Sequence, residues 1–198
     1  ENIYLGSEIN IFEEKLKRNE KLIKDVDIDK VIKLLSEGKV VGLIQGKAEA
    51  GPRALGNRSL LLDPTLPNAK DIMNRIKKRE TFRPFACTIT EEKVNKYFDM
   101  EKTQYMMLAA QAKKLAKETI PSLVHVDNTC RVQTVNKNQN KILYSILKNF
   151  KIPVLMNTSF NLSGKSMVEK FLDVLWTIRN SELQYVYFAN YKILLYKE

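Results

Sequence analysis

The sequence is poor in the residues that build metal sites and disulfide frameworks. Its 198 residues include two cysteines and one histidine. Cys87 and Cys130 form no CxxC pair and no Cys/His spacing, which argues against a zinc site and against a disulfide framework. We therefore expect no bound metal in this chain, free thiols, and a reducing, cytoplasmic setting.

Long hydrophobic runs and targeting segments are also missing. The longest apolar stretches are short pieces such as 40–44 and 193–195, whereas a membrane span needs about 20 residues. No signal peptide pattern is present, so we expect no membrane partner. The chain begins with Glu1 rather than methionine, which favours a piece processed or cut from a longer protein.

Acidic residues are fewer than basic ones, since 33 Lys and Arg against 23 Asp and Glu give a formal net charge of +10. Two explanations stay open at this point. Lysines can cover solvated helix faces, or the excess can indicate a phosphate or polyanion partner such as nucleic acid. No block of five like charges exists, which excludes a disordered basic tail. Hydrophobic residues, at 44%, are sufficient for the core of one domain of this length.

The first 26 residues are charged and weakly periodic. We expect residues 1–26 to be a lead-in or linker before a domain at 27–198. A clear helix begins behind the acidic cap Asp27 and stops at Gly38. In the lead-in, the apolar residues that could line one side of a short helix are Ile9, Phe12, Leu16 and Ile23.

Helix and strand patterns alternate along the rest of the chain. The apolar run 39–45 predicts a buried strand. Further helices are expected at 68–78, 91–98, 138–150 and 169–179. Further strands are expected at 85–90, 123–135 (a strand or hairpin), 153–156, 185–188 and 193–196, the last two as a closing hairpin. Interleaved helices and strands indicate the α/β class.

Glycine is scarce, yet five of the seven glycines fall between residues 38 and 56. Because glycine tolerates positive φ and close approach of a ligand, the segment 45–59 predicts a binding loop. Arg53 and Arg58 in this loop can form bidentate contacts with phosphate or carboxylate oxygens. The P-loop pattern is absent. A surface loop with solvated arginines explains the spacing equally well.

A second basic segment, 77–85, ends one of the expected helices. The helix dipole alone favours cations there. Arg83 is different, because it lies between Phe82 and Pro84 and a cation held in an apolar setting needs an anion. His125 has no second histidine or cysteine near it, so it is not expected to bind a metal, and no GxSxG elbow supports a catalytic triad.

Two later segments add polar groups to the candidate site. Strand alternation in 131–135 places Arg131 and Gln133 on one face. In 154–164 a buried strand opens into a polar turn that contains Asn157 and Ser159. The carboxyl ends of strands are frequent ligand sites in α/β sheets, although Asn/Ser turns are also common on their own.

Taken in order, four motifs resemble those of one family. They are Gly51-Pro-Arg-Ala-Leu-Gly-Asn-Arg-Ser59, Lys78-Arg-Glu-Thr-Phe-Arg-Pro-Phe85, His125-Val-Asp127 with Arg131-Val-Gln-Thr134, and Pro153-Val-Leu-Met-Asn-Thr-Ser-Phe-Asn161. The series is similar to the C-terminal, YrdC-like domain of O-carbamoyltransferases that modify nodulation factors, aminoglycosides, novobiocin-type compounds and cephalosporins. The resemblance runs from about Tyr4 to the end of the chain.

The resemblance implies a YrdC-like twisted mixed α/β sheet with flanking helices and a basic concave face. It implies a transferase that uses carbamoyl phosphate and ATP with Mg²⁺ to form carbamoyl adenylate. The carbamoyl group would then pass to an acceptor hydroxyl at an actin- or sugar-kinase-like N-terminal domain, which this chain lacks and where iron is expected. The implied partners are small-molecule substrates and that N-terminal domain of the same polypeptide, without which the activity is incomplete.

The resemblance also assigns roles residue by residue. Catalytic and carbamoyl phosphate-binding groups are implied at Lys77, Arg83 and Arg131, with further carbamoyl phosphate-binding groups at Asn157 and Ser159. The implied ATP phosphate-binding residues are Arg53, Asn57, Arg58 and Ser59. Adenylate formation needs no side-chain nucleophile, because positioning and charge neutralisation suffice.

Two other classes of function stay open. The chain could be a YrdC-like nucleotide- or RNA-binding module without activity of its own, or a degenerate domain kept for structure. Nucleic acid is the less favoured partner, because the motif arginines are flanked by Gly, Pro and Phe and no RNA motif with interleaved aromatics is present.

Overall fold

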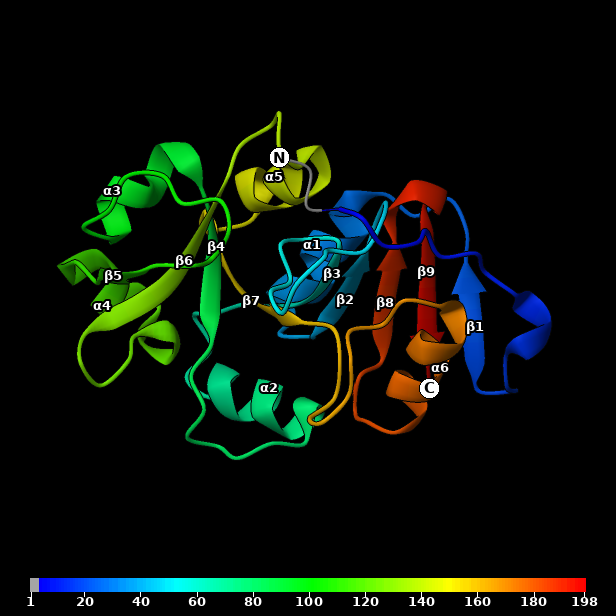
Figure 1. Ribbon diagram of the computed structural model, residues 1–198. Coiled ribbons are helices and arrows are strands. Elements are labelled where there is room, and N and C mark those ends of the chain that lie inside the picture. Colours follow the sequence, from blue (N-terminus) through cyan, green and yellow to red (C-terminus); the bar gives the residue numbers. More distant parts are fainter. Residues whose placement is uncertain (1–3) are drawn as a thin grey trace.

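The computed structural model describes residues 4–198, which form a mixed sheet with helices on both faces (Figure 1). Within this range the sheet has nine strands in the order β1-β9-β8-β2-β3-β7-β4-β6-β5. β2 pairs parallel with β8, as β4 does with β6, and the other neighbours are antiparallel. The strands are β1 (Glu20–Ile23), β2 (Val41–Ile44), β3 (Arg58–Leu62), β4 (Ala86–Thr90), β5 (Ala109–Gln111), β6 (Thr129–Val135), β7 (Val154–Ser159), β8 (Tyr185–Phe188) and β9 (Ile193–Lys197).

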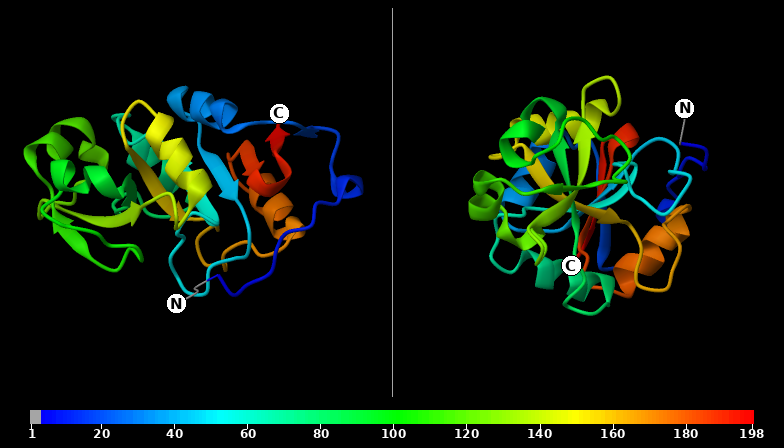
Figure 2. Two further views of the ribbon diagram at one scale, coloured as in Figure 1. Left: turned by 90° about the horizontal axis from the view of Figure 1, so that it is seen from above. Right: turned by 60° about the vertical axis from the view of Figure 1, so that its left-hand side comes forward.

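Helices cover both faces of this sheet, and Figure 2 shows α1 and α5 on the side away from α6. The α-helices of residues 4–198 are α1 (Ile28–Ser36), α2 (Ala69–Lys77), α3 (Val94–Tyr97), α4 (Lys114–Thr119), α5 (Lys141–Asn149) and α6 (Phe171–Arg179). One buried cluster joins α1 and α5 to strand residues such as Leu43 and Leu155. A second cluster joins α2, α3, α4 and α6 to residues such as Leu60 and Met156. The expected mixed α/β sheet with flanking helices is confirmed.

The helix predicted behind Asp27 is confirmed in detail. The Asp27 carboxylate accepts hydrogen bonds from the backbone N–H groups of Asp29 and Lys30, which caps α1. Gly38 follows the helix with φ +76°, a conformation that favours glycine. The closing hairpin is also present, since β8 and β9 pair antiparallel around a 3-10 turn at Ala189–Tyr191.

The segment expected as a lead-in differs from that expectation. Within residues 4–26 the structure has a 3-10 helix at Glu13–Lys15 and the edge strand β1, which pairs with β9. Ile9 is buried in the main core, whereas Ile23 is half exposed. The four apolar residues therefore share no helix face, because strand pairing at Glu20–Ile23 takes the place of helical hydrogen bonds.

Besides β1, two strands and one α-helix have no counterpart in the sequence-based prediction, namely β3, β5 and α4. β3 begins with Arg58 and Ser59, the last two residues of the segment 45–59 for which the glycines predict a binding loop. In the structure it is buried along its whole length between β2 and β7. β7 likewise continues to Ser159, three residues past the predicted end.

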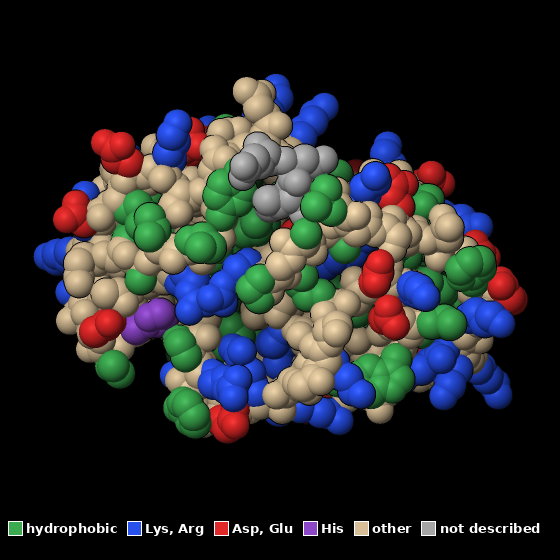
Figure 3. All heavy atoms as spheres, viewed as in Figure 1, with side chains coloured by type: hydrophobic (Ala, Val, Ile, Leu, Met, Phe, Trp, Pro, Cys, Tyr) green, Lys and Arg blue, Asp and Glu red, His purple; other side chains and the backbone are tan. Residues whose placement is uncertain are grey.

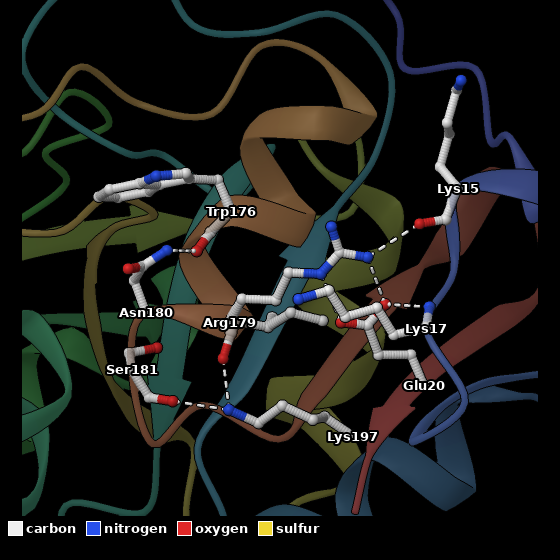
Figure 4. Close-up of polar contacts among 9 residues, drawn as sticks. Lys15, Lys17, Glu20, Trp176, Arg179, Asn180, Ser181 and Lys197 are labelled. Atoms are coloured by element: carbon white, nitrogen blue, oxygen red, sulfur yellow. Dashed lines mark hydrogen bonds and ion pairs between the residues drawn. The ribbon is translucent and has the colours of Figure 1, made fainter.

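An ion pair fastens the N-terminal segment to the end of α6 (Figure 4). Arg179 Nε and Nη2 each lie 2.6 Å from a carboxylate oxygen of Glu20, whose side chain is 1% exposed. Arg179 Nη2 also donates to Lys15 O, and Lys17 N donates to Glu20 Oε2. Lys197 Nζ donates to the carbonyl oxygens of Ile178 and Ser181, at the same helix end. These contacts bring the chain before β1 into the folded unit.

Replacement of Glu20 should destabilise the fold in a pH-dependent manner. The bond from Arg179 holds the pKa of Glu20 below its usual 4.5. The ion pair therefore contributes fully above about pH 4.5, and its contribution is lost as the pH falls through the lowered pKa. We expect Glu20→Gln to reduce the free energy of unfolding by about 1–3 kcal/mol at pH 7, measured by urea titration. The difference from wild type should shrink at pH 3.

The matched control is Glu14→Gln, which alters an exposed carboxylate on the same segment. Its effect should stay within about 0.5 kcal/mol at both pH values. Equal effects of the two substitutions at pH 7 would contradict the role given to the Glu20–Arg179 pair.

Candidate active site

The candidate site lies on one face of the sheet where β7, β4 and β6 run side by side. Ala86 of β4 pairs with Asn157 of β7, and Cys87 pairs with Val132 of β6. Extending the second register by one residue places Ala86 opposite Arg131. Asn157 and Arg131 therefore flank a small side chain, on the face that the helices α1 and α5 cover further along. This arrangement forms the floor of the site.

Lys77, the last residue of α2, reaches the end of β7 from beside the sheet. Its amine is almost fully buried, with the residue 3% exposed. Lys77 Nζ donates to Ser159 O at 2.5 Å, to Ser159 Oγ at 3.2 Å and to Asn161 Oδ1 at 2.8 Å. Burial, together with the nearby Arg79 guanidinium, lowers the pKa of Lys77 to about 7. The amine can thus change its charge near neutral pH.

Two further cations follow Lys77 in the same segment. Arg79 lies over the Phe85 ring at 4.2 Å from its centroid and donates from Nε to Asn74 Oδ1 at 2.6 Å. Burial and then the charge of Arg83 lower the pKa of Arg79 to about 10. Arg83 is half exposed and forms an ion pair with Glu80 at 2.8 Å. Three cations therefore lie close together with one carboxylate beside them.

Arg131 contributes a fourth cation and Arg53 a fifth. Burial and the nearby Arg53 lower the pKa of Arg131. Figure 3 shows Lys and Arg side chains gathered in the middle of the side that it draws, over β4 and α2. Like charges brought together at partly buried positions favour the binding of an anion, which relieves their repulsion. The structure places Lys77 against Ser159, and it places Arg131 across Ala86 from Asn157. Arg83 lies near Arg79. The roles implied for these residues stay predictions.

Arg79 and Asn161 are site residues that the sequence reasoning missed. Asn161 Oδ1 accepts hydrogen bonds from both Lys77 Nζ and Ser159 Oγ, the latter at 2.7 Å. A signal was available for both residues. Arg79 belongs to the same basic run as Lys77, and Asn161 follows Ser159 by two residues, which is the spacing of side chains on one face of an extended chain.

The glycine-rich segment forms a loop that covers the floor. Gly51 and Gly56 have φ of +126° and +111°. The buried Glu49 carboxylate accepts hydrogen bonds from Leu55 N at 2.7 Å and from Asn57 N at 2.8 Å. Leu55 also packs with Ala86 in a small buried cluster. An internal carboxylate therefore fixes the shape of the loop that carries Arg53.

Arg58 departs from the expectation that it binds phosphate. Its side chain is fully buried, and its two terminal nitrogens donate to backbone carbonyl oxygens, among them Gln45 O and Ser7 O at 2.9 and 2.8 Å. The register explains this. Ser59 pairs with Ser159 on the site's face, so Arg58 points to the opposite face. In this conformation Arg58 holds neighbouring loops together.

The other two residues expected at the ATP phosphates have local partners as well. Ser59 Oγ accepts a hydrogen bond from Gly56 N at 3.0 Å. Asn57 Nδ2 donates to Lys47 O at 2.8 Å. Asn57 lines a neighbouring hollow together with Lys47 and Lys141. Arg53, the fourth residue, lies near enough to Arg131 for its charge to lower the pKa of Arg131.

A small uncharged hollow adjoins the floor. It has a volume of about 180 Å³. Two of its lining residues, Leu55 and Gln133, also border the floor of the site. The remaining lining residues are Tyr4, Gln104, Tyr105, Thr134, Val135, Gln139 and Asn140. Rings and amides without charge suit a flat, polar heterocycle rather than a phosphate.

Within residues 4–198, no group of three or more His, Cys, Asp or Glu residues is placed to hold a metal ion. His125 lies with Nε2 at 3.4 Å from Phe85 O and Nδ1 at 3.4 Å from Thr129 Oγ1. Cys87 and Cys130 are buried free thiols. In the same part of the chain, no helix has both the length and the apolar character needed to cross a bilayer.

Comparison with solved structures supports the fold. The full-length HypF in its phosphate- and nucleotide-bound form superposes with a TM-score of 0.58, at 19% identity, over 90% of this chain and 22% of that one. Sua5 of P. abyssi superposes with a TM-score of 0.51, at 15% identity, over 71% of this chain and 40% of that one. These neighbours confirm the YrdC-like fold.

Comparison with curated sequences gives closer relatives. Nodulation protein NolNO of Sinorhizobium fredii is 35% identical over 168 residues, which cover 80% of this chain and 25% of that protein. Nodulation protein NolO of Bradyrhizobium diazoefficiens is 35% identical over 75% of this chain and 29% of that protein. An uncharacterised protein of Methanocaldococcus jannaschii is 36% identical over 97% of this chain and 40% of its own length. The chain thus spans well under half of each of these relatives.

The family of the chain follows from a match over most of its length. The family described as Carbamoyltransferase C-terminus matches residues 32–194. This range contains Arg131, Asn157 and Ser159, which share one face of the sheet, and Lys77, which contacts Ser159. On this evidence the chain belongs to the Carbamoyltransferase C-terminus family.

Proposed function

We propose that this chain is the part of an O-carbamoyltransferase that binds carbamoyl phosphate and ATP and forms carbamoyl adenylate. The observation that carries the proposal is a cluster of cations, in which Glu80 pairs with Arg83. The cations are Lys77, Arg79, Arg83, Arg131 and Arg53. Two phosphorylated substrates bring several negative charges to one place, and this cluster supplies the opposite charge. Transfer to an acceptor hydroxyl would take place outside this chain.

The chemistry suits the groups that are present. An adenylate forms when a carboxylate oxygen attacks the α-phosphorus of ATP and displaces pyrophosphate. Carbamoyl phosphate must therefore first lose its phosphate to water and leave carbamate. Neither step needs a protein nucleophile, so the residues serve to hold the oxygens in line and to neutralise charge. Mg²⁺ would enter bound to the phosphates of ATP.

Arg131 and Arg83 should differ in their contributions to carbamoyl phosphate binding. Arg131 is more buried and carries the repulsion of Arg53, so we expect Arg131→Ala to weaken affinity by about 10–100-fold. Arg83 is half exposed and already paired with Glu80, so Arg83→Ala should cost about tenfold or less. Calorimetric titration of the 198-residue chain measures both. Lys114→Ala removes an exposed cation away from the site and is the control. Unchanged affinity in both arginine variants would refute the proposed role of these arginines in carbamoyl phosphate binding.

The charge of Lys77 should make anion binding depend on pH. Because its pKa is about 7, the amine is protonated below neutral pH and becomes neutral as the pH rises. Sulfate is a suitable probe, since its charge stays constant between pH 6 and 9. We expect sulfate to bind about tenfold more weakly at pH 8.5 than at pH 6 in the wild type. Lys77→Arg should abolish this dependence, and an equal dependence in both proteins would assign it to another group.

The uncharged hollow beside Leu55 and Gln133 is the proposed binding site of the adenine base of ATP. Tyr105 lines it and is accessible, with 42% of its surface exposed. We expect Tyr105→Ala to weaken ATP–Mg²⁺ binding by about fivefold or more, since loss of stacking on a base costs about 1–3 kcal/mol. Carbamoyl phosphate affinity should not change. A loss of both affinities together would show that the substitution disturbs the whole site instead.

RNA binding is the second candidate, and the net charge of +10 is the observation that permits it. Binding to a nucleic acid would weaken steeply between 50 and 200 mM salt, roughly by orders of magnitude. Specific binding of carbamoyl phosphate would show a weaker dependence. Titration of a single-stranded RNA oligonucleotide at both salt concentrations separates the two functions.

A further inference from the structure

A chain of amide groups crosses the floor of the site. Gln133 Nε2 donates to Leu55 O at 2.9 Å, and Asn157 Nδ2 donates to Gln133 Oε1 at 3.0 Å and to Ala54 O at 3.3 Å. Gln133 and Asn157 are 4% and 1% exposed. Because both residues are buried, each unpaired polar atom in this chain would be costly.

The direction of the chain is fixed at its start by the backbone. The carbonyl oxygens of Leu55 and Ala54 can only accept, so each must receive an N–H group. Gln133 therefore turns its amide nitrogen toward Leu55 and its oxygen toward Asn157. Asn157 in turn must point its nitrogen toward Gln133 and Ala54. A flip of either amide would set an oxygen against a carbonyl oxygen.

One atom is left over at the end of this chain. Asn157 Oδ1 is buried and has no hydrogen-bond partner among residues 4–198. The carbonyl oxygen can only accept, so whatever completes it must be a donor. Asn157 faces Arg131 across Ala86 and lies two residues before Ser159 on the same face of β7. The missing donor therefore belongs at the site itself.

Access to this atom limits the size of the donor. Leu55 and Met106 pack with Ala86 and cover the floor. Exposure rises along β7 from the buried Asn157 to the partly exposed Ser159. A group that reaches Asn157 Oδ1 from the Ser159 end must therefore be small. A phosphate attached to that group would stay near the cations.

We infer that Asn157 Oδ1 accepts a hydrogen bond from the amine of the carbamoyl group, and that the Gln133–Asn157 chain makes the site selective for carbamoyl over acetyl phosphate. The inference rests on the proposed function. An acetyl group has the same shape, but a methyl group replaces the amine and cannot donate. Its binding would leave Asn157 Oδ1 buried and unpaired, which is the condition under which polar sites reject an analogue most strongly. Gln133 acts as a positioning residue, since it touches Asn157 rather than the substrate.

The test compares two ligands rather than one. The 198-residue chain is titrated by calorimetry with freshly dissolved carbamoyl phosphate and with acetyl phosphate. We expect the wild type to bind carbamoyl phosphate at least about tenfold more tightly. Equal affinity for the two ligands would overturn this inference and leave the phosphate site intact. Absence of binding by a folded wild type to either ligand would instead overturn the proposed function.

One substitution at Asn157 tests the hydrogen bond directly. Asn157→Leu removes the acceptor at similar volume and should bring the ratio of the two affinities to within about twofold of one. A preserved ratio in this variant would contradict the assignment.

Thr88→Val is the matched control. Thr88 lies on β4 next to Gln133, and its buried Oγ1 also has no partner within residues 4–198. It is further from Ser159, beside Leu155 rather than Asn157. The ratio should not change in this variant. A change as large as that of Asn157→Leu would mean that any loss of polarity on this face alters selectivity, and would refute the specific role of Asn157.

Discussion

The need to hold like charges together at the end of one strand determines how this part of the molecule is built. Lys77, Arg79 and Arg83 follow one another within seven residues, and a cluster of this kind is unfavourable unless other groups compensate for it. Arg83 pairs with the Glu80 carboxylate, whereas the fold compensates Lys77 and Arg79 with neutral oxygens. Ser159 O, Ser159 Oγ and Asn161 Oδ1 accept from Lys77, and Asn74 Oδ1 accepts from Arg79. Neutral acceptors stabilise the cations without cancelling their positive charge, so this charge stays available to attract an anion.

The contrast between Arg58 and Arg131 shows what sequence patterns can and cannot establish. Both arginines belong to motifs, and both were expected to bind phosphate. The position of each arginine within its strand decides to which face of the sheet it points, because neighbouring residues of a strand face opposite sides. The alternation of valines with polar residues in β6 is visible in the sequence, so the sheet face on which Arg131 lies was predictable. The sheet face of Arg58 was not predictable, because the register of β3 against β7 depends on strands almost a hundred residues apart.

Local sequence patterns predicted the structure correctly where a single local interaction determines it. The cap at Asp27 and the stop at Gly38 predicted α1, and the order of four motifs predicted the family and the fold. Elements that depend on distant partners were missed. β1 exists because β9 offers an edge, and β5 because β6 does. Their own sequences are too short and too polar to indicate a strand, and tertiary pairing decides such cases.

The site divides recognition between two kinds of group. In the proposed function the cations would attract the phosphate, but they would not distinguish one acyl phosphate from another, because the charge is the same. The amides of Gln133 and Asn157 carry no charge and add little attraction, yet backbone carbonyls of the glycine-rich loop fix their orientation. A buried amide with one unpaired oxygen discriminates by the cost of leaving it unpaired rather than by the strength of a contact. The loop held by Glu49 thus links the two tasks, since it carries both Arg53 and the carbonyl groups that orient the amides.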